Sequence, residues 1–489
     1  MREEVLKRAW HLLNQSRFLA AAFLVAFVVR AIPEIMVGPN PVGFDTIAYY
    51  VPQTLDIAAG RLTIFQIIGT APVIYTISVP AYLMAGIDPT LTFKVMGPVS
   101  YGLLISALFL FLRSTLHWSE RASLGGALLA SAYFVTLRIS WDLYRTMLGL
   151  TFFIFAIPLI DKTGSTKQQL TLASLIMLAV ASDQITGVLS LSIISLVLAK
   201  SFINSNRERS IRLAKVAIPG ILLLSLIIYG QQAGSLLAQQ SLVPQLNTLN
   251  DSLGFLVFAY LPLSPLIFLG FPEVSNTPLR IWTIVCLVLS TTSLRPLFGP
   301  IVASARWSIL LTFPFCVYAT AGVMRVVRRR SMLTKPGIIH GKLLFSIVIL
   351  VILGASLYVL PPAQRSFAYY SAYPLYLPTS MIQSTVPASD MSSLRQLLAW
   401  VSSNLPFESV LITHQAIYGW AREYIPADKI INYGFSGPLQ GLSIAKKEGF
   451  RSVLLIWWVN GSGWYGQESV PSGFTKLYSE GELAVYGHY

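Results

Sequence analysis

Residues 18–37 read FLAAAFLVAFVVRAIPEIMV, an apolar run in which only Arg30 and Glu34 carry a charge. A helix of about 20 apolar residues is long enough to cross the hydrocarbon layer of a bilayer, which is about 30 Å thick. The run follows a basic segment, Met1 to Arg17, and it ends without the small-residue cleavage site of a signal peptide. We therefore predict a retained first transmembrane helix, in which Arg30 departs from the apolar pattern.

Composition extends this prediction to most of the chain. Of the 489 residues, 54% are hydrophobic and 11% are charged, whereas a soluble chain carries about 25% charged residues. The excess of apolar side chains must face lipid, so we predict a polytopic membrane protein. The net charge of +14 does not indicate a nucleic-acid partner, because the basic residues lie between apolar runs. Cys286 and Cys316 lie inside apolar runs and provide neither a disulfide framework nor a CxxC metal site.

Ten further apolar runs approach the length of a transmembrane helix, so we predict about eleven spans in all. They lie near residues 91–112, 122–139, 146–160, 168–182, 184–200, 215–230, 253–271, 280–293, 307–325 and 342–360. One more segment, 64–85, is apolar enough to span but contains Gly69, Pro72 and Pro80. Its placement depends on the direction of the chain across the membrane.

The distribution of basic residues decides that placement. With eleven spans and a cytoplasmic N-terminus, twenty lysines and arginines of the membrane part fall inside, whereas the outside segments between spans hold only seven, in agreement with the positive-inside rule. A further span at 64–85 would reverse all later spans and put the basic cluster from Arg325 to Lys335 outside. We therefore predict that 64–85 lies along the outer interface as one or two amphipathic helices, and that the C-terminus is outside.

The composition changes after Leu360. Residues 361–489 contain eight basic and eight acidic residues, so the excess positive charge belongs to the membrane part. We predict a transmembrane domain, 1–360, with a structured first outer loop, 38–90, and a small extracytoplasmic α/β domain, 361–489. The second domain is indicated by two helical patterns, two strand patterns and a hairpin, at Met391–Asn404, Pro438–Glu448, Ser409–Thr413, Val453–Trp458 and Phe474–Val485.

Acidic residues at the outer ends of the spans are the first candidates for chemistry, because ionisable groups near membrane depth are costly. The first outer loop opens with Gly43-Phe44-Asp45-Thr46-Ile47-Ala48-Tyr49-Tyr50. Asp45 could act as a general base on an acceptor, or it could bind a metal. Alternatively, Asp45 caps a helix from Thr46 to Ala59, on which Asp56 and Arg61 are solvated. The residues alone leave both interpretations open.

Three arginines at the outer edge are candidates for binding a phosphate, because a guanidinium donates two parallel hydrogen bonds. Arg138 and Arg145 flank Asp142 in the short second outer loop, where an internal Arg-Asp pair is the alternative. Arg306 begins the tenth span, where it could instead extend to the membrane interface without a binding role. Asp183 in the third outer loop is a weaker candidate.

Together these features resemble the GT-C superfamily of integral-membrane glycosyltransferases, which use polyprenyl-phosphate-linked sugars. The resemblance rests on a first span after a basic N-terminus and on a long first outer loop that opens with Gly43-Phe44-Asp45 and Tyr49. It also rests on the stretch Pro72–Gly86, a short second outer loop with Asp142, and a C-terminal outer domain. It covers nearly the whole chain in layout and implies a GT-C-like α-helical membrane fold.

The resemblance also implies roles for the candidate residues. It implies a catalytic acid at Asp45 and a second acid or substrate-binding group at Asp142. The rest of the predicted site comprises a donor-phosphate group, Arg306, Arg138 and Arg145, and a substrate-binding group, Tyr49, Tyr50 and Asp183.

The sequence departs from the oligosaccharyltransferase type of this superfamily in two motifs. That type carries Trp-Trp-Asp-Tyr-Gly early in its soluble domain, whereas Trp457-Trp458-Val459-Asn460 comes late and contains no Asp. No Asp-x-Asp pair occurs at Asp45 or Asp142. The departures favour a single-sugar transferase of the protein mannosyltransferase or aminoarabinose transferase kind. No metal ligand is predicted, and the cofactor stays open because no paired acidic motif supports a divalent metal.

We therefore expect a multi-pass plasma-membrane enzyme that moves a sugar from a polyprenyl-phosphate donor to a lipid, glycan or protein acceptor on the extracytoplasmic side. Asp45 would deprotonate the acceptor for an inverting attack, and membrane lipids would surround the spans. One alternative is a lipid or solute transporter, in which Asp45, Asp142 and Asp183 would serve as coupling or gating groups. Transporters usually place such groups near the midplane, whereas these are expected at one face. Another alternative is a non-catalytic scaffold whose soluble domain binds a partner.

Overall fold

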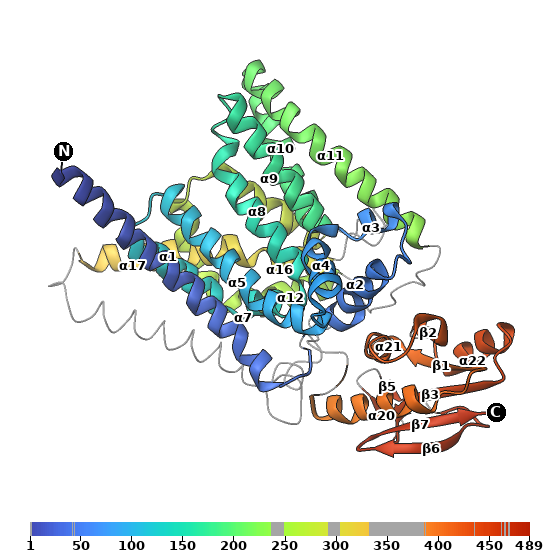
Figure 1. Ribbon diagram of the computed structural model, residues 1–489. Coiled ribbons are helices and arrows are strands. Elements are labelled where there is room, and N and C mark those ends of the chain that lie inside the picture. Colours follow the sequence, from blue (N-terminus) through green and yellow to red (C-terminus); the bar gives the residue numbers. More distant parts are fainter. Residues whose placement is uncertain are drawn as a thin grey trace.

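The chain folds into a helical part followed by a mixed α/β domain (Figure 1). A computed structural model describes residues 2–41, 43, 45–235, 249–291, 304–331, 386, 388–434, 436–460, 462–463, 466–467 and 470–489. The predicted last span, 342–360, and the predicted domain boundary at residue 360 lie outside these ranges, so both stay predictions.

Ten of the eleven predicted spans fall on helices. Within the described residues, six helices are long and apolar enough to cross a membrane: Ser16–Met36, Pro89–Ser114, Gln184–Ile203, Arg207–Gln231, Leu253–Glu273 and Arg306–Arg328. The helical segments concerned are α1 (Arg2–Met36), α5 (Pro89–Ser114), α8 (Tyr144–Ile160), α9 (Thr166–Ser182), α10 (Gln184–Ile203), α11 (Arg207–Ser235), α12 (Leu249–Tyr260), α13 (Ser264–Gly270), α14 (Thr277–Thr291), α16 (Ser304–Leu310) and α17 (Thr312–Ser331). The multi-pass membrane class is thus confirmed, and the prediction of about eleven spans is confirmed only in part.

The predicted straight span 122–139 is wrong in shape. Two helices, α6 (Glu120–Ala132) and α7 (Phe134–Asp142), meet there at a bend of 65° and count together as a seventh candidate span. Tyr133 leaves the helical conformation at the bend, and its hydroxyl donates a hydrogen bond to the carbonyl of Ala259 on α12. A side-chain contact to a distant helix therefore accompanies a break that no proline or glycine marks in the sequence.

Segment 64–85 forms two short helices, α3 (Ile64–Gly69) and α4 (Tyr75–Ala85), as the sequence predicts. A 3-10 turn, η2 (Pro72–Ile74), separates them, and Ala71 before it takes a left-handed backbone conformation with a φ of 56°. On α4, Met84 is 87% exposed, and Leu83 and Ile77 are also exposed. These apolar side chains suit a lipid-facing position, and the location at the outer interface stays a prediction.

The C-terminal domain is built on a five-stranded sheet with the order β2-β1-β3-β7-β6. Strands β1 (Ser409–His414), β2 (Ile430–Gly434) and β3 (Ser452–Trp458) are parallel, and the hairpin of β6 (Thr475–Glu480) and β7 (Leu483–His488) adds antiparallel. The two predicted helices are α20 (Met391–Asn404) and α22 (Pro438–Lys447). The sequence patterns miss β2 and the helix α21 (Gln415–Ala421), because both are short and β2 is only partly buried.

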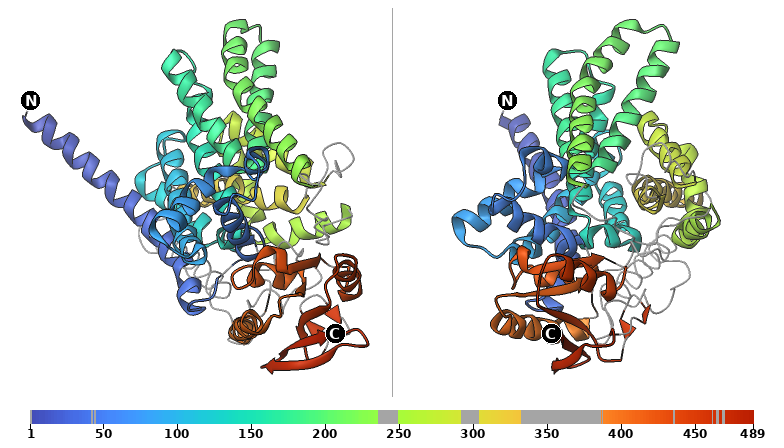
Figure 2. Two further views of the ribbon diagram at one scale, coloured as in Figure 1. Left: turned by 45° about the vertical axis from the view of Figure 1, so that its right-hand side comes forward. Right: turned by 90° about the vertical axis from the view of Figure 1, so that its right-hand side faces the viewer.

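The C-terminal domain lies at one end of the helical part, beside the first outer loop (Figures 1 and 2). The connection between α10 and α11, where the predicted cytoplasmic bases Lys200, Arg207 and Arg209 fall, lies at the other end. This separation agrees with the predicted sidedness. The orientation relative to the cytoplasm stays a prediction.

His414 connects strand β1 to helix α21 and is completely buried. Its Nδ1 accepts a hydrogen bond of 3.1 Å from the backbone N–H of Ala416, which caps α21. Burial lowers the pKa of His414 to about 4, because the charged imidazolium loses its hydration. Protonation at Nδ1 would remove the cap.

We expect the C-terminal domain to lose stability as the pH falls from 6.5, the ordinary pKa of histidine, to about 4. In this window the unfolded chain binds a proton that the folded chain does not, so the free energy of unfolding falls by up to about 3 kcal/mol. Replacing His414 by asparagine, which also caps helices, should remove this pH dependence. Scanning calorimetry of both full-length proteins above and below the window measures it, and an equal pH dependence in the variant would contradict the assignment.

Candidate active site

Asp45 stands directly before a turn of π-helix, η1 (Thr46–Tyr50), which continues into α2 (Val51–Ala58). π-helical turns are rare and frequently occur at functional sites. Asp45 is 8% exposed, and its side chain makes no capping hydrogen bond to the helix that follows. The alternative of a helix cap is therefore not what the structure shows.

Asp45 instead pairs with Arg306. The guanidinium Nη2 of Arg306, on α16, lies 3.3 Å from Oδ2 of Asp45, although the two residues are 261 positions apart in the chain. The Arg306 side chain keeps 28% of its surface exposed, whereas that of Asp45 keeps 11%. Arg306 therefore has room to contact a second anion without leaving the neighbourhood of the carboxylate.

Tyr49 lies among the same charges. Burial, followed by the negative charge of Asp45, raises the pKa of the Tyr49 hydroxyl to about 12, and the positive charges of Arg306 and Arg145 act in the opposite direction. The phenol therefore keeps its proton at any physiological pH and can donate a hydrogen bond. The structure thus brings Asp45, Tyr49, Arg145 and Arg306 into one neighbourhood, as the sequence analysis proposed.

Arg145 enters this group from the first turn of α8. Its Nη1 donates a 2.7 Å hydrogen bond to the carbonyl of Thr70, and the guanidinium lies 5.6 Å from the ring centroid of Tyr50. Its buried Nε has no hydrogen-bond partner among the described residues. Tyr50 is 1% exposed and stacks on Tyr144, so it serves as a buried support for Arg145.

Three predicted residues remain, Asp183, Arg138 and Asp142. Asp183, 4% exposed, caps α10 by accepting hydrogen bonds from the backbone N–H and the hydroxyl of Thr186, while its charge acts on Arg145. Arg138 is 2% exposed on α7. Asp142 is the last residue of α7, and its side chain lies outside the described part of the chain.

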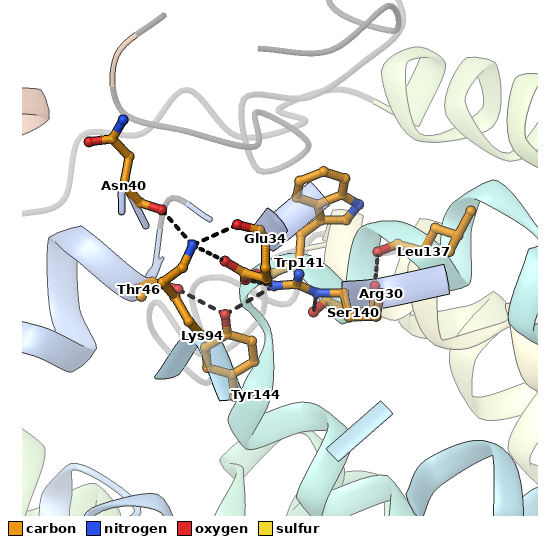
Figure 3. A network of polar contacts seen from close by, with 9 residues as sticks. All are labelled: Arg30, Glu34, Asn40, Thr46, Lys94, Leu137, Ser140, Trp141 and Tyr144. Atoms are coloured by element: carbon orange, nitrogen blue, oxygen red, sulfur yellow. Dashed lines mark hydrogen bonds and ion pairs between the residues drawn. The ribbon is translucent and has the colours of Figure 1, made fainter. Parts of the chain in front are cut away.

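A second group of charges, beside the first, did not enter the predicted site. Glu34 near the end of α1 binds Arg30 Nη2 at 2.6 Å and Lys94 Nζ at 2.7 Å (Figure 3). Lys94, on α5, also donates hydrogen bonds to the carbonyls of Glu34 and Asn40. Arg30 is 1% exposed and donates to the carbonyls of Ser140 and Trp141 on α7. The network therefore ties α1, α5 and α7 together.

Tyr144 connects this network to the Asp45 turn. Its hydroxyl oxygen accepts hydrogen bonds from Arg30 Nη2 at 3.2 Å and from the Thr46 hydroxyl at 3.3 Å (Figure 3). Gly97 on α5 makes the approach possible, because a Cβ there would lie 3.1 Å from both Arg30 and Tyr144. The sequence held one signal for this network, the unusual charge of Arg30 inside an apolar run, with Glu34 one helical turn later.

In the part of the chain that the structure describes, no group of three or more His, Cys, Asp or Glu side chains could hold a metal ion. The acids nearest to Asp45 in sequence, Glu34 and Asp56, are engaged by basic residues. Among the side chains that the structure describes, the groups at Asp45 are thus its own carboxylate, two arginines and a neutral phenol.

Comparison with known proteins identifies the fold. No protein-family model and no curated protein matches the sequence significantly. Among solved structures, the crystal structure of ArnT from Cupriavidus metallidurans in the apo state matches with a TM-score of 0.57 at 12% identity, over 99% of this chain and 98% of that chain. The structure of the same ArnT bound to undecaprenyl phosphate matches with a TM-score of 0.50 at 12% identity, over 98% of each chain. The predicted GT-C resemblance is confirmed at the level of the fold.

Proposed function

We propose that this protein is a membrane glycosyltransferase that moves a sugar from a polyprenyl-phosphate donor to an acceptor, with Asp45 as the general base. The observation that carries the proposal is the pairing of buried Asp45 with Arg306, beside Arg145 and Tyr49. The shared fold with ArnT, one structure of which holds undecaprenyl phosphate, supports the donor class.

In the proposed reaction the Asp45 carboxylate takes the proton from the acceptor hydroxyl or amine. The freed electron pair forms a bond to the anomeric carbon of the donor sugar. The bond from that carbon to the phosphate oxygen breaks on the opposite side, and polyprenyl phosphate leaves with the electron pair. Direct displacement of this kind inverts the anomeric configuration, and a lone carboxylate provides the general base.

The two arginines have the chemistry needed to stabilise the departing phosphate. Donors that are already in place where negative charge develops are the most effective form of electrostatic catalysis. Arg306 is partly exposed and touches Asp45, so a phosphate bound to it would bring the anomeric carbon close to the base. Arg145 has a buried Nε without a partner among the described residues, and Tyr49 adds a neutral O–H donor.

Arg138 and Asp142 are weaker candidates for a direct role in the proposed reaction. Arg138 is buried on α7, whose carbonyls at Ser140 and Trp141 bind Arg30, so it fits a supporting role better than direct phosphate binding. Asp142, at the end of the same helix, remains our second candidate acid. The transporter alternative receives less support, because the Asp45 group lies beside the C-terminal domain at one end of the helical part.

Transfer from purified protein tests the function. The full chain in lipid nanodiscs is incubated with labelled undecaprenyl- and dolichyl-phosphate sugars, and release of polyprenyl phosphate is measured with a mixture of lipid, glycan and peptide acceptors. We expect release from at least one donor. Release from none, together with no binding of undecaprenyl phosphate, would overturn the proposal.

Binding of undecaprenyl phosphate to a variant of Arg145 tests the proposed phosphate site. Arg145→Ala should weaken binding of undecaprenyl phosphate by about tenfold or more, the scale of one lost charge-assisted hydrogen bond. Arg61→Ala is the matched control, because Arg61 lies in the first outer loop, is 45% exposed and pairs with Asp56. Equal binding by both variants would exclude Arg145 from the phosphate site.

A further inference from the structure

Helix α21 of the C-terminal domain packs directly on the backbone of the turn that follows Asp45. A Cβ atom at Gly419 would lie 1.8 Å from the carbonyl oxygen of Ile47 and 2.8 Å from its side chain. Contacts this close are accessible only to glycine. Ile47 itself is 1% exposed and belongs to the apolar core of the C-terminal domain, together with residues of α21 such as Ile417 and Trp420.

Polar contacts surround this apolar contact. Arg422, the residue after α21, binds both carboxylate oxygens of Asp56 on α2, with distances of 2.6 Å and 3.4 Å. The Thr90 hydroxyl at the start of α5 donates a 2.6 Å hydrogen bond to Glu423. Arg395 on α20 donates to the carbonyl of Pro39 at 3.3 Å. These contacts reach both ends of the first outer loop and α2 within it.

We propose that the C-terminal domain is a clamp that sets the position of Asp45, with Gly419 and Arg422 as positioning residues. The proposal rests on the proposed function for its catalytic consequence, because it assumes that Asp45 is the base. Its structural content is independent: residues 45–58 hold their conformation because α21 and Arg422 hold Ile47 and Asp56. In this view the domain contributes to catalysis without touching the substrate.

The geometry explains why two contacts of different kinds are needed. The glycine contact places α21 against the π turn only two residues from Asp45. The Arg422 side chain is 3% exposed, and its two-point contact with the Asp56 carboxylate fixes the rotation of α2. A shift of the turn by about 1 Å moves a catalytic group far enough to slow a reaction about 100-fold.

The first test changes Gly419 in the full chain. Gly419→Ala should lower kcat by about 100-fold, while the KM for the donor changes less than threefold, because the arginines that bind phosphate lie on α8 and α16. Alanine favours helix over glycine, so a lower helix propensity cannot cause the loss. The matched control is Gly125→Ala on α6, where a Cβ would meet nothing within 4 Å and activity should stay unchanged.

The second test changes Arg422. Arg422→Ala should lower kcat by about tenfold, and Arg422→Lys, which keeps the charge but not the two-point contact, should restore it only in part. Arg451→Ala is the matched control, because Arg451 forms an exposed ion pair with Glu408 in the same domain, away from the first outer loop. The Arg422→Ala variant keeps the proposal testable if the Gly419→Ala protein fails to fold.

Hydrogen–deuterium exchange of residues 45–58 separates the two proposals, because it does not depend on turnover. Faster exchange in the Gly419 and Arg422 variants, with normal exchange in both controls, supports the clamp. Faster exchange with unchanged kcat would support the clamp and overturn Asp45 as the base. Exchange equal to wild type in a folded Gly419→Ala or Arg422→Ala protein would overturn the clamp, whatever the activity.

Discussion

Asp45→Asn is expected to lower kcat for sugar transfer by about 100- to 10,000-fold, the usual contribution of a general base. Asparagine keeps the size of the side chain and can still accept a hydrogen bond from Arg306, but it cannot take the acceptor proton. Removal of the carboxylate also frees the positive charge of Arg306, which lies 3.3 Å away. Binding of undecaprenyl phosphate should therefore be unchanged or tighter in the variant, while turnover is lost.

This combination distinguishes a base from a structural carboxylate. A structural role would reduce folding and donor binding together with turnover. The matched control is Asp161→Asn, because Asp161 forms an ion pair with Arg209 near the connection of α10 and α11 and is 57% exposed. Wild-type turnover by purified Asp45→Asn protein supplied with donor would remove Asp45 from the mechanism.

Glu34→Ala is expected to lower the free energy of unfolding by about 3–5 kcal/mol, the cost of leaving a buried charge without its partner. Glu34 is 6% exposed and is the acid that binds both Arg30 and Lys94 in this network. Its loss leaves two cations facing each other between α1 and α5. The midpoint of thermal unfolding of purified protein in nanodiscs measures the change.

Two further variants serve as controls for the unfolding midpoint of Glu34→Ala. Glu208→Ala removes an acid that pairs with Arg212 at the surface, where it is 82% exposed, so the midpoint should hardly change. The double variant Glu34→Gln with Lys94→Met removes one charge of each sign and should recover a large part of the stability. A midpoint of Glu34→Ala equal to that of the Glu208 control would show that the network does not hold the helices.

The link through Tyr144 gives this network a second consequence. Tyr144 accepts hydrogen bonds from Arg30 and from Thr46, the residue after Asp45. The Asp45 turn therefore contacts the buried charge network through Thr46 and the C-terminal domain through Ile47. A rigid support of this kind is what a precisely placed base requires.

The sequence predicted correctly those properties that depend on neighbouring residues. Long apolar runs identified the membrane part, helical spacing identified α20 and α22, and strand-like patterns identified β1, β3 and the hairpin. Asp45 became a candidate because charged groups at the ends of spans are costly, and Arg306 became one because it begins a span; their roles stay proposals. Hydropathy and periodicity are local, and they can be read without knowledge of the fold.

Only the tertiary structure decided which of these residues meet. Asp45 and Arg306 are 261 positions apart, and Thr90 and Glu423 are 333 apart. The bend at Tyr133, the burial of Glu34 between two cations, and the contact of Gly419 with Ile47 depend on how distant helices pack. The sequence by itself determined that a basic, apolar chain crosses a membrane several times, and it singled out charged residues at the ends of the spans as candidates. Packing decided which carboxylate is paired, buried and held in place, because close contacts between distant segments leave no periodic pattern in the sequence.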